Sequence, residues 1–155
     1  MDDGSGGGRA VVEAEREFVT LTLGGQLCGI PVLDVQDVLG DEKLTPVPLA
    51  PPEIAGCLNL RGRIATAVDV RRQLGLPSAG DAAGHMSLVT EQDGELYALI
   101  VDRVIEVVRL PTAGLEPVPP TLPVGWAAAS TGIYRVNGRL LIGLDVKRLL
   151  AAVTE

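Results

Sequence analysis

The stretch that decides the fold is IAGCLNLRGRIATAVDVRRQLG, at residues 54–75. Its pattern predicts a strand, a turn at Gly62, a second strand over residues 63–68, and a short helical turn that begins at Asp69 and ends at Gly75. The same unit returns as STGIYRVNGRLLIGLDVKRLLA at residues 130–151, at a constant offset of 76. A constant offset indicates one unit used twice. We assign structural roles to the equivalent pairs Gly56 and Gly132, Gly62 and Gly138, and Asp69 and Asp145.

A second repeat lies upstream of each unit, at an offset of about 69. Residues 18–23 alternate in polarity and are followed by a turn at Gly24-Gly25 and another strand, and residues 86–101 repeat this arrangement around Asp93-Gly94. The next segment, residues 31–39, fits a helical stripe and a strand equally well. The equivalent segment of the second copy, VIEVVRL, is rich in β-branched residues, which favour strands. We therefore interpret both copies as a helical turn that leads into a strand.

The chain therefore predicts an all-β fold of two copies, each with about five strands and a final turn of helix. A half of roughly 70 residues buries too little surface to be stable alone, so we expect the halves to share a hydrophobic core. Closing each sheet into a barrel would remove exposed strand edges. The proline-rich connectors, residues 43–52 and 112–123, belong on edges. We expect a flexible tail at residues 1–15 and one domain over 16–155, with its two lobes joined near residues 76–84.

Composition excludes several classes of function. The net charge of −7 and the pI near 4.7 argue against nucleic acid as a partner. There is no signal-peptide pattern and no apolar run near the roughly 18 residues that span a bilayer, so we expect a soluble cytoplasmic protein without membrane insertion. Cys28 and Cys57 are expected to be buried free thiols. His85 is the only histidine, so we expect no metal site, no cofactor and no histidine-based triad.

Asp69 and Asp145 are the one pair of residues that suggests catalysis. Equivalent carboxylates in a duplicated β-fold can form an acid/base dyad, as in a hydrolase. Each, however, opens a short helix, where an aspartate accepts backbone N–H bonds as an N-cap and contributes about 0.5–2 kcal/mol. The bulky residues that follow each aspartate favour capping. We therefore expect that the protein is not an enzyme.

The tip of the first hairpin, Asn59 to Gly62, allows two interpretations. One is an ordinary turn with Gly62 in a left-handed conformation and Arg61 in water. In the other, Arg61 anchors a partner as a multidentate donor while Leu60 is buried at the contact. The second copy has a different tip, residues 135–138, and this asymmetry favours the functional interpretation.

Four segments together resemble the CheW-like domain family of chemotaxis coupling proteins, over about residues 17–150. They are GIPVLDVQDV, TPVPLAPPEIAGCLNLRGRIATAVDVRRQLG, ALIVDRVIEVVRL and LDVKRLL. Cys28, Cys57-Leu58 and Thr66 depart from the usual family residues, and all lie where we expect core or sheet. The resemblance implies two intertwined five-stranded SH3-like barrels that share a hydrophobic core, with short helical turns.

It also implies a function without catalysis. Members of this family are adaptors that couple the cytoplasmic tip of chemoreceptors to the histidine kinase CheA, whose regulatory domain has the same fold, in receptor arrays at the inner membrane. By motif carry-over, the receptor-facing candidates are Val35, Val38, Asn59, Leu60 and Arg61. The candidates for kinase contact, on the opposite barrel, are Val136 and Leu140.

Two other functions stay open at this point. A CheW-like scaffold for another receptor–kinase system would have the same fold and the same exposed tip. A small β-barrel that binds oligonucleotides is disfavoured by the acidic charge and by an aromatic content of only 3%.

Overall fold

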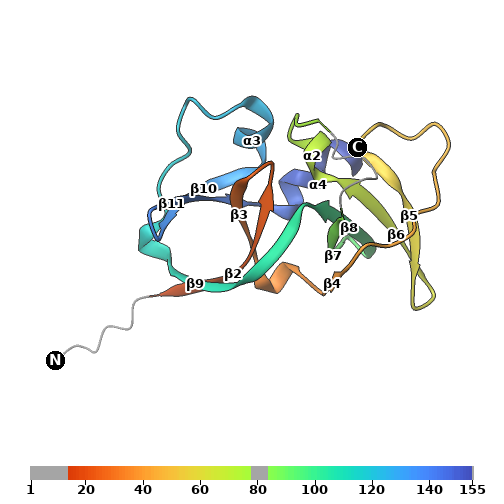
Figure 1. The fold of residues 1–155 in the computed structure, drawn as a ribbon, viewed down its shortest axis with the longest axis horizontal. Helices are drawn as coiled ribbons and strands as arrows, with labels where there is room; N and C mark the ends of the chain where they lie inside the picture. Colours follow the sequence, from red (N-terminus) through yellow and green to blue (C-terminus); the bar gives the residue numbers. More distant parts are fainter. Residues whose placement is uncertain (1–13, 78–83, 155) are drawn as a thin grey trace.

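The computed structural model describes residues 14–77 and 84–154, with side chains up to residue 151. Of the predicted tail, residues 1–13 lie outside the described residues, as do residues 78–83 of the predicted link. The described chain forms two lobes side by side, with short helices between them (Figure 1). None of the helices in the described ranges is long and apolar enough to cross a membrane.

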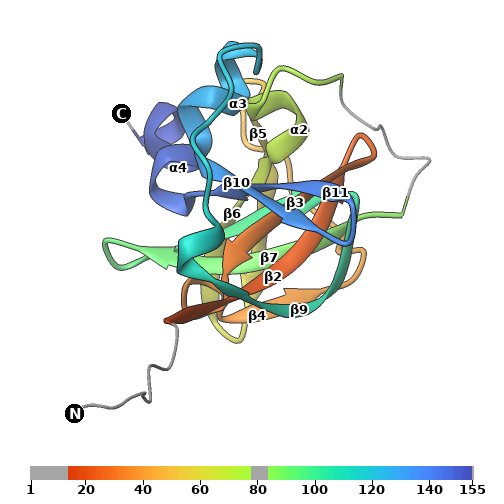
Figure 2. The same cartoon turned by 90° about the vertical axis from the view of Figure 1, so that its left-hand side faces the viewer.

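Each lobe is a five-stranded sheet that curls into a small barrel. Barrel 1 has the strand order β4-β7-β8-β6-β5 and barrel 2 has the order β10-β11-β3-β2-β9. The strands of barrel 1 are β4 (Asp37–Leu39), β5 (Ile54–Leu60), β6 (Arg63–Asp69), β7 (Met86–Gln92) and β8 (Glu95–Val101). Those of barrel 2 are β2 (Glu15–Leu23), β3 (Gln26–Pro31), β9 (Arg103–Pro111), β10 (Ser130–Val136) and β11 (Arg139–Leu144). Figure 2 looks onto barrel 2. Both halves of the chain supply strands to both barrels, so the intertwined all-β fold is confirmed.

The remaining elements are short helices. They are η1 (Val32–Asp34), α2 (Val70–Gln73), η2 (Thr112–Gly114), α3 (Val124–Ala129) and α4 (Val146–Thr154). The predicted helical turn before a strand is present in the first copy, where η1 precedes β4. In the second copy the prediction is wrong, because β9 begins at Arg103 and only Asp102 separates it from β8. Pro31 opens the turn in the first copy, whereas Ile100 occupies the equivalent position and continues β8.

Each barrel closes in the same way, and this closure explains the glycines at the equivalent positions 56 and 132. The chain beyond β4 reaches β5, where Thr45 and Cys57 exchange two backbone hydrogen bonds of 2.8 Å. The chain beyond β9 likewise reaches β10, where Glu116 and Ile133 exchange bonds of 2.8 and 2.9 Å. The proline-rich connectors therefore lie on edges, as predicted. Gly56 and Gly132 precede these closures, at equivalent register shifts.

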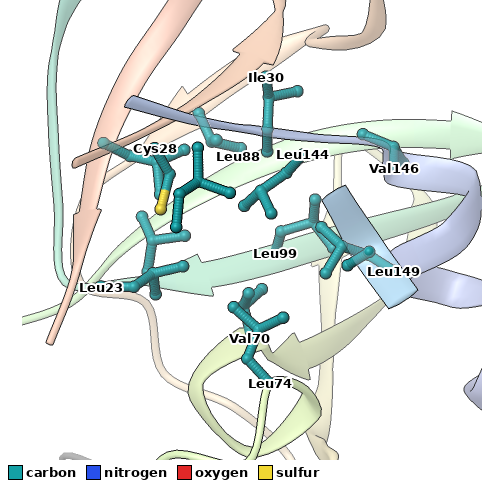
Figure 3. Packing of buried hydrophobic residues seen from close by; sticks show 14 of the residues in the cluster. Leu23, Cys28, Ile30, Val70, Leu74, Leu88, Leu99, Leu144, Val146 and Leu149 are labelled. Carbon is teal, nitrogen blue, oxygen red and sulfur yellow. The ribbon is translucent and has the colours of Figure 1, made fainter. Parts of the chain in front are cut away.

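A shared hydrophobic core joins the two barrels (Figure 3). Leu23 and Cys28 of barrel 2 meet Leu88 and Leu99 of barrel 1, and side chains of α2 and α4 pack beside them. Trp126 of α3, a helix that the pattern did not predict, is buried in the same cluster. The predicted shared core is thus confirmed, and it draws residues from both copies.

The two cysteines are free thiols in different surroundings. Cys28 is fully buried, and burial together with the nearby charge of Asp102 raises the pKa of its thiol to about 12. Cys57 lies on β5 and is half-buried, so the prediction of burial is correct for Cys28 and only partly correct for Cys57. A thiol with so high a pKa stays protonated and behaves as a small apolar side chain.

Candidate partner-binding site

The tip of the β5–β6 hairpin is a tight turn with a positively charged residue at an unusual position. Arg61 has φ 51° and Gly62 has φ 90°, which is the left-handed pair of a two-residue hairpin loop. At the equivalent tip of β10–β11 these places are taken by Asn137 and Gly138, with φ 49° and 79°. Asparagine tolerates the left-handed region better than arginine does. The turn geometry alone therefore does not account for Arg61.

Asn59 serves the turn itself. Its side-chain oxygen accepts a hydrogen bond of 2.9 Å from the backbone N–H of Gly62. This contact supports the structural interpretation for Asn59, while leaving the adjacent Leu60 and Arg61 side chains to be explained.

Arg61 reaches across to the neighbouring edge strand. Its guanidinium lies 3.2 Å from a carboxylate oxygen of Asp37 on β4, whose other oxygen accepts a bond of 2.8 Å from the N–H of Val38. The Arg61 side chain is 87% exposed, so the ion pair contributes little to stability. Most of the guanidinium faces solvent and can bind a carboxylate of a partner.

Beside this ion pair, barrel 1 has a hollow of about 180 Å³. Its apolar lining is Leu60, Val89 and Leu96, and its polar lining is Gln36, Asp37, Arg61 and Arg63. The barrel interior below is filled by small side chains, among them Ala65, Ala67 and Ala98. In barrel 2 the matching interior holds Phe18 and Tyr134, with ring centroids 5.3 Å apart. The smaller side chains of barrel 1 are consistent with a hollow at its end.

A second ionic contact holds the far rim of the hollow in place. Glu91 on β7 accepts hydrogen bonds from Gln36, at 3.1 Å, and from Arg63, at 3.3 Å. These bonds, with the charge of Arg63, lower the pKa of the Glu91 carboxyl. The rim therefore presents ordered charges of both signs around an apolar floor, an arrangement suited to a partner that offers an apolar side chain flanked by charge.

The structure separates the five receptor-facing candidates. Leu60 and Arg61 line the hollow, Asn59 lies at the adjoining turn, and Val38 follows Asp37 on β4 with 40% of its surface exposed. Val35 lies apart from them, half-buried against the shared core. The residues of the hollow that the sequence did not indicate are Gln36, Asp37, Arg63, Val89 and Leu96. Two of them are repeated in the sequence, Asp37 as Glu106 at the offset of 69 and Arg63 as Arg139 at the offset of 76.

The two kinase-facing candidates lie at the end of barrel 2. Val136 is half-buried against the cluster around Tyr134, and Leu140 is 42% exposed on β11. At the offset of 76 they correspond to Leu60 and to Ile64, which is 63% exposed. Both barrels therefore present an apolar side chain beside the tip of the same hairpin.

The paired aspartates cap helices. Asp69 accepts a bond of 3.1 Å from the N–H of Arg71, and Asp145 accepts one of 2.9 Å from the N–H of Lys147. An arginine one turn along also lies near each carboxylate, at 3.9 and 3.7 Å. Capping thus accounts for both side chains without catalysis. In the part of the chain that the structure describes, no three histidine, cysteine or acidic side chains gather where they could hold a metal ion.

Comparison with known proteins identifies the family. The CheW-like domain profile matches residues 17–154. Chemotaxis protein CheW of Rhizobium meliloti is 26% identical over 132 residues, which cover 84% of this chain and 85% of the relative. Chemotaxis protein CheW of Klebsiella aerogenes is 28% identical over 137 residues, covering 88% and 82%.

A solved structure agrees with this assignment. The crystal structure of the scaffolding protein TtCheW from Thermoanaerobacter tengcongensis superposes with a TM-score of 0.79 at 28% identity, over 89% of this chain and 94% of the other. The duplicated hairpins, the two intertwined barrels and these matches all lead to one conclusion: the chain belongs to the CheW-like domain family of chemotaxis scaffold proteins.

Proposed function

We propose that this protein is a non-catalytic adaptor that couples the cytoplasmic tip of chemoreceptors to a CheA-type histidine kinase. The observation that carries the proposal is the position of Arg61. It occupies a left-handed turn position that asparagine fills in barrel 2, is 87% exposed, and borders an apolar hollow. A residue that the fold does not require, beside an apolar depression, is a good candidate for a partner contact.

The two barrels offer separate surfaces for the two partners. The hollow of barrel 1, with Leu60 and Arg61, would take an apolar side chain of the receptor next to a carboxylate. The end of barrel 2, with Val136 and Leu140, would meet the regulatory domain of the kinase. Such an adaptor would work in the cytoplasm, in receptor arrays at the inner membrane. Its single contacts would be small and modest in affinity, and an array would strengthen them by multivalency.

A binding titration of a receptor cytoplasmic fragment tests the receptor surface. The variant Arg61→Ala should weaken binding by about tenfold, as expected for loss of one charged anchor. The matched control is Arg109→Ala, because Arg109 is also exposed and paired at 3.3 Å with Glu17, but lies on barrel 2. Equal binding by wild type and Arg61→Ala, with the fold intact, would show that this surface does not bind the receptor. A folded protein that binds neither chemotaxis partner would instead serve another receptor–kinase system.

A further inference from the structure

Asp102 occupies the point where the chain passes from barrel 1 to barrel 2. It is the only residue between β8 and β9, which belong to different barrels (Figure 1). Its backbone N–H donates to the carbonyl of Thr22 on β2, at 3.2 Å, and its carboxylate accepts a bond of 2.8 Å from the N–H of Gly24. Asp102 is thus fastened to the β2–β3 hairpin of barrel 2.

The same carboxylate is bound from the side of barrel 1. Arg71 of α2 donates to its two oxygens, at 2.6 and 2.7 Å. The side chains of Arg71 and Asp102 are only 22% and 20% exposed. Arg71 also donates to the carbonyl of Pro77, at 3.2 Å, which fixes the guanidinium further. A bidentate pair of this kind constrains both distance and angle, and solvent screens it less than a surface pair.

The directions in which the pKa values of the two groups shift agree with a charged pair. Burial raises the pKa of the Asp102 carboxyl, but the hydrogen bonds from Arg71 and Gly24 outweigh burial and lower it overall. The bond to Asp102 raises the pKa of Arg71. Both groups are therefore ionised near neutral pH.

Among the residues that the structure describes, the other passage between the barrels has no such pair. The chain runs from β3 to β4 through residues 32–36, where the offset of 69 places Leu33 at the position of Asp102. Leu33 is 96% exposed. The offset of 76 places Lys147, an exposed residue, at the position of Arg71. Within the described part of the chain, the ionic tie therefore exists on one side of the pseudo-symmetric molecule.

This one-sided tie has a geometric consequence. The shared core holds the barrels together, but apolar burial is not directional. The hydrogen bonds of the Arg71–Asp102 pair are directional and constrain the orientation of one barrel relative to the other, because they join α2 of barrel 1 to the hairpin of barrel 2 through one carboxylate. We propose that Arg71 and Asp102 are positioning residues that set the angle between the two barrels, and so the angle between the two partner surfaces. The link to partner binding rests on the proposed function.

Distance measurement between the barrels tests the geometric claim without any partner. Spin labels are attached through E95C on β8 and R139C on β11, both exposed positions, in a C57S background that leaves the buried Cys28 untouched. Pulsed electron paramagnetic resonance should show one narrow distance distribution. Asp102→Asn and Arg71→Ala should shift and broaden it, and Arg71→Lys, which keeps the charge without the two parallel bonds, should fall between. Arg109→Ala breaks an ion pair within barrel 2 and should leave the distance distribution unchanged.

The outcomes are decisive in both directions. An unchanged distribution in folded Asp102→Asn and Arg71→Ala would overturn the proposal. If Asp102→Asn does not fold, Arg71→Lys decides the matter by the same measurement. With partners present, Asp102→Asn should bind a receptor fragment and a kinase regulatory domain singly as wild type does, yet lose their joint co-sedimentation. Wild-type protein that binds neither partner would count against the proposed function and leave the distance result standing.

Discussion

Gly56 lies so close to the carbonyl oxygen of Thr45 that a Cβ atom placed on it would come within 2.7 Å of that oxygen. The equivalent Gly132 stands in the same relation to Glu116, at 2.6 Å. With φ of 152° and 147°, both backbones also lie in a region that other residues rarely adopt. These two close approaches are the places where the barrels close.

Replacing either glycine should open its barrel. We expect Gly56→Ala and Gly132→Ala each to lower the free energy of unfolding by about 2–4 kcal/mol, because the strained backbone and the displaced closing segment add together. Gly40→Ala is the control, since nothing lies within 4 Å of a Cβ there. Urea unfolding followed by circular dichroism measures all three. Wild-type stability in Gly56→Ala would contradict this account of closure.

Two buried threonines should respond to valine in opposite ways. Among the described residues, the Thr90 hydroxyl has no hydrogen-bond partner, whereas the Thr20 hydroxyl donates to the carbonyl of Glu106 at 2.8 Å and accepts from its N–H at 3.2 Å. Thr90→Val should be neutral or stabilise by up to about 1 kcal/mol, and Thr20→Val should destabilise by about 1–3 kcal/mol. Thermal unfolding of both variants would show the contrast, and equal losses would be inconsistent with it.

The Asp102 carboxylate should make the free energy of unfolding depend on pH in the acidic range. Because its folded pKa lies below the ordinary value of 3.8, its contribution is fully present above the pKa of the unfolded chain and is lost as pH falls through the folded value. The difference in unfolding free energy between wild type and Asp102→Asn should therefore be constant near neutral pH and shrink below about pH 4. Urea midpoints taken along a pH series measure it. A difference that does not change with pH would mean that the charge of Asp102 is not what stabilises the junction.

Substitution of Asp69 and Asp145 tests whether these two side chains stabilise the fold as helix caps. Asp69→Ala and Asp145→Ala should each cost about 0.5–2 kcal/mol, while the asparagine variants, which retain a capping oxygen, should stay close to wild type. The measurement is again the unfolding free energy of each variant. If asparagine were as damaging as alanine at both positions, capping would be the wrong explanation.

Much of the fold could be predicted because its signals are local. The β5–β6 and β10–β11 hairpins, the caps at Asp69 and Asp145 and the glycine turns depend on residues close together in the chain. The exchange of strands, which pairs β8 with β6 but β9 with β2, was expected only from the family resemblance. The helical turn expected before β9 failed because a β-branched run paired with β2 along most of its length.

The candidate site was harder to predict because tertiary packing assembles it. The pairs Arg61–Asp37 and Arg71–Asp102 join residues that no local pattern connects. In the sequence, nothing distinguishes Val89 and Leu96 from other strand residues. They line the hollow only because the closed barrel places them there. Val35 carries the family motif yet packs against the shared core, because motif position does not fix the direction of a side chain.

The measurement that tests the central claim most directly is co-sedimentation of a CheA-type kinase with vesicles that carry a receptor cytoplasmic fragment, with and without this protein. We expect the kinase to sediment with the receptor when the protein is present, and to do so less with Arg61→Ala than with Arg109→Ala. Kinase that stays in the supernatant, while the folded protein also fails to sediment, would contradict the proposal that this chain couples chemoreceptors to CheA.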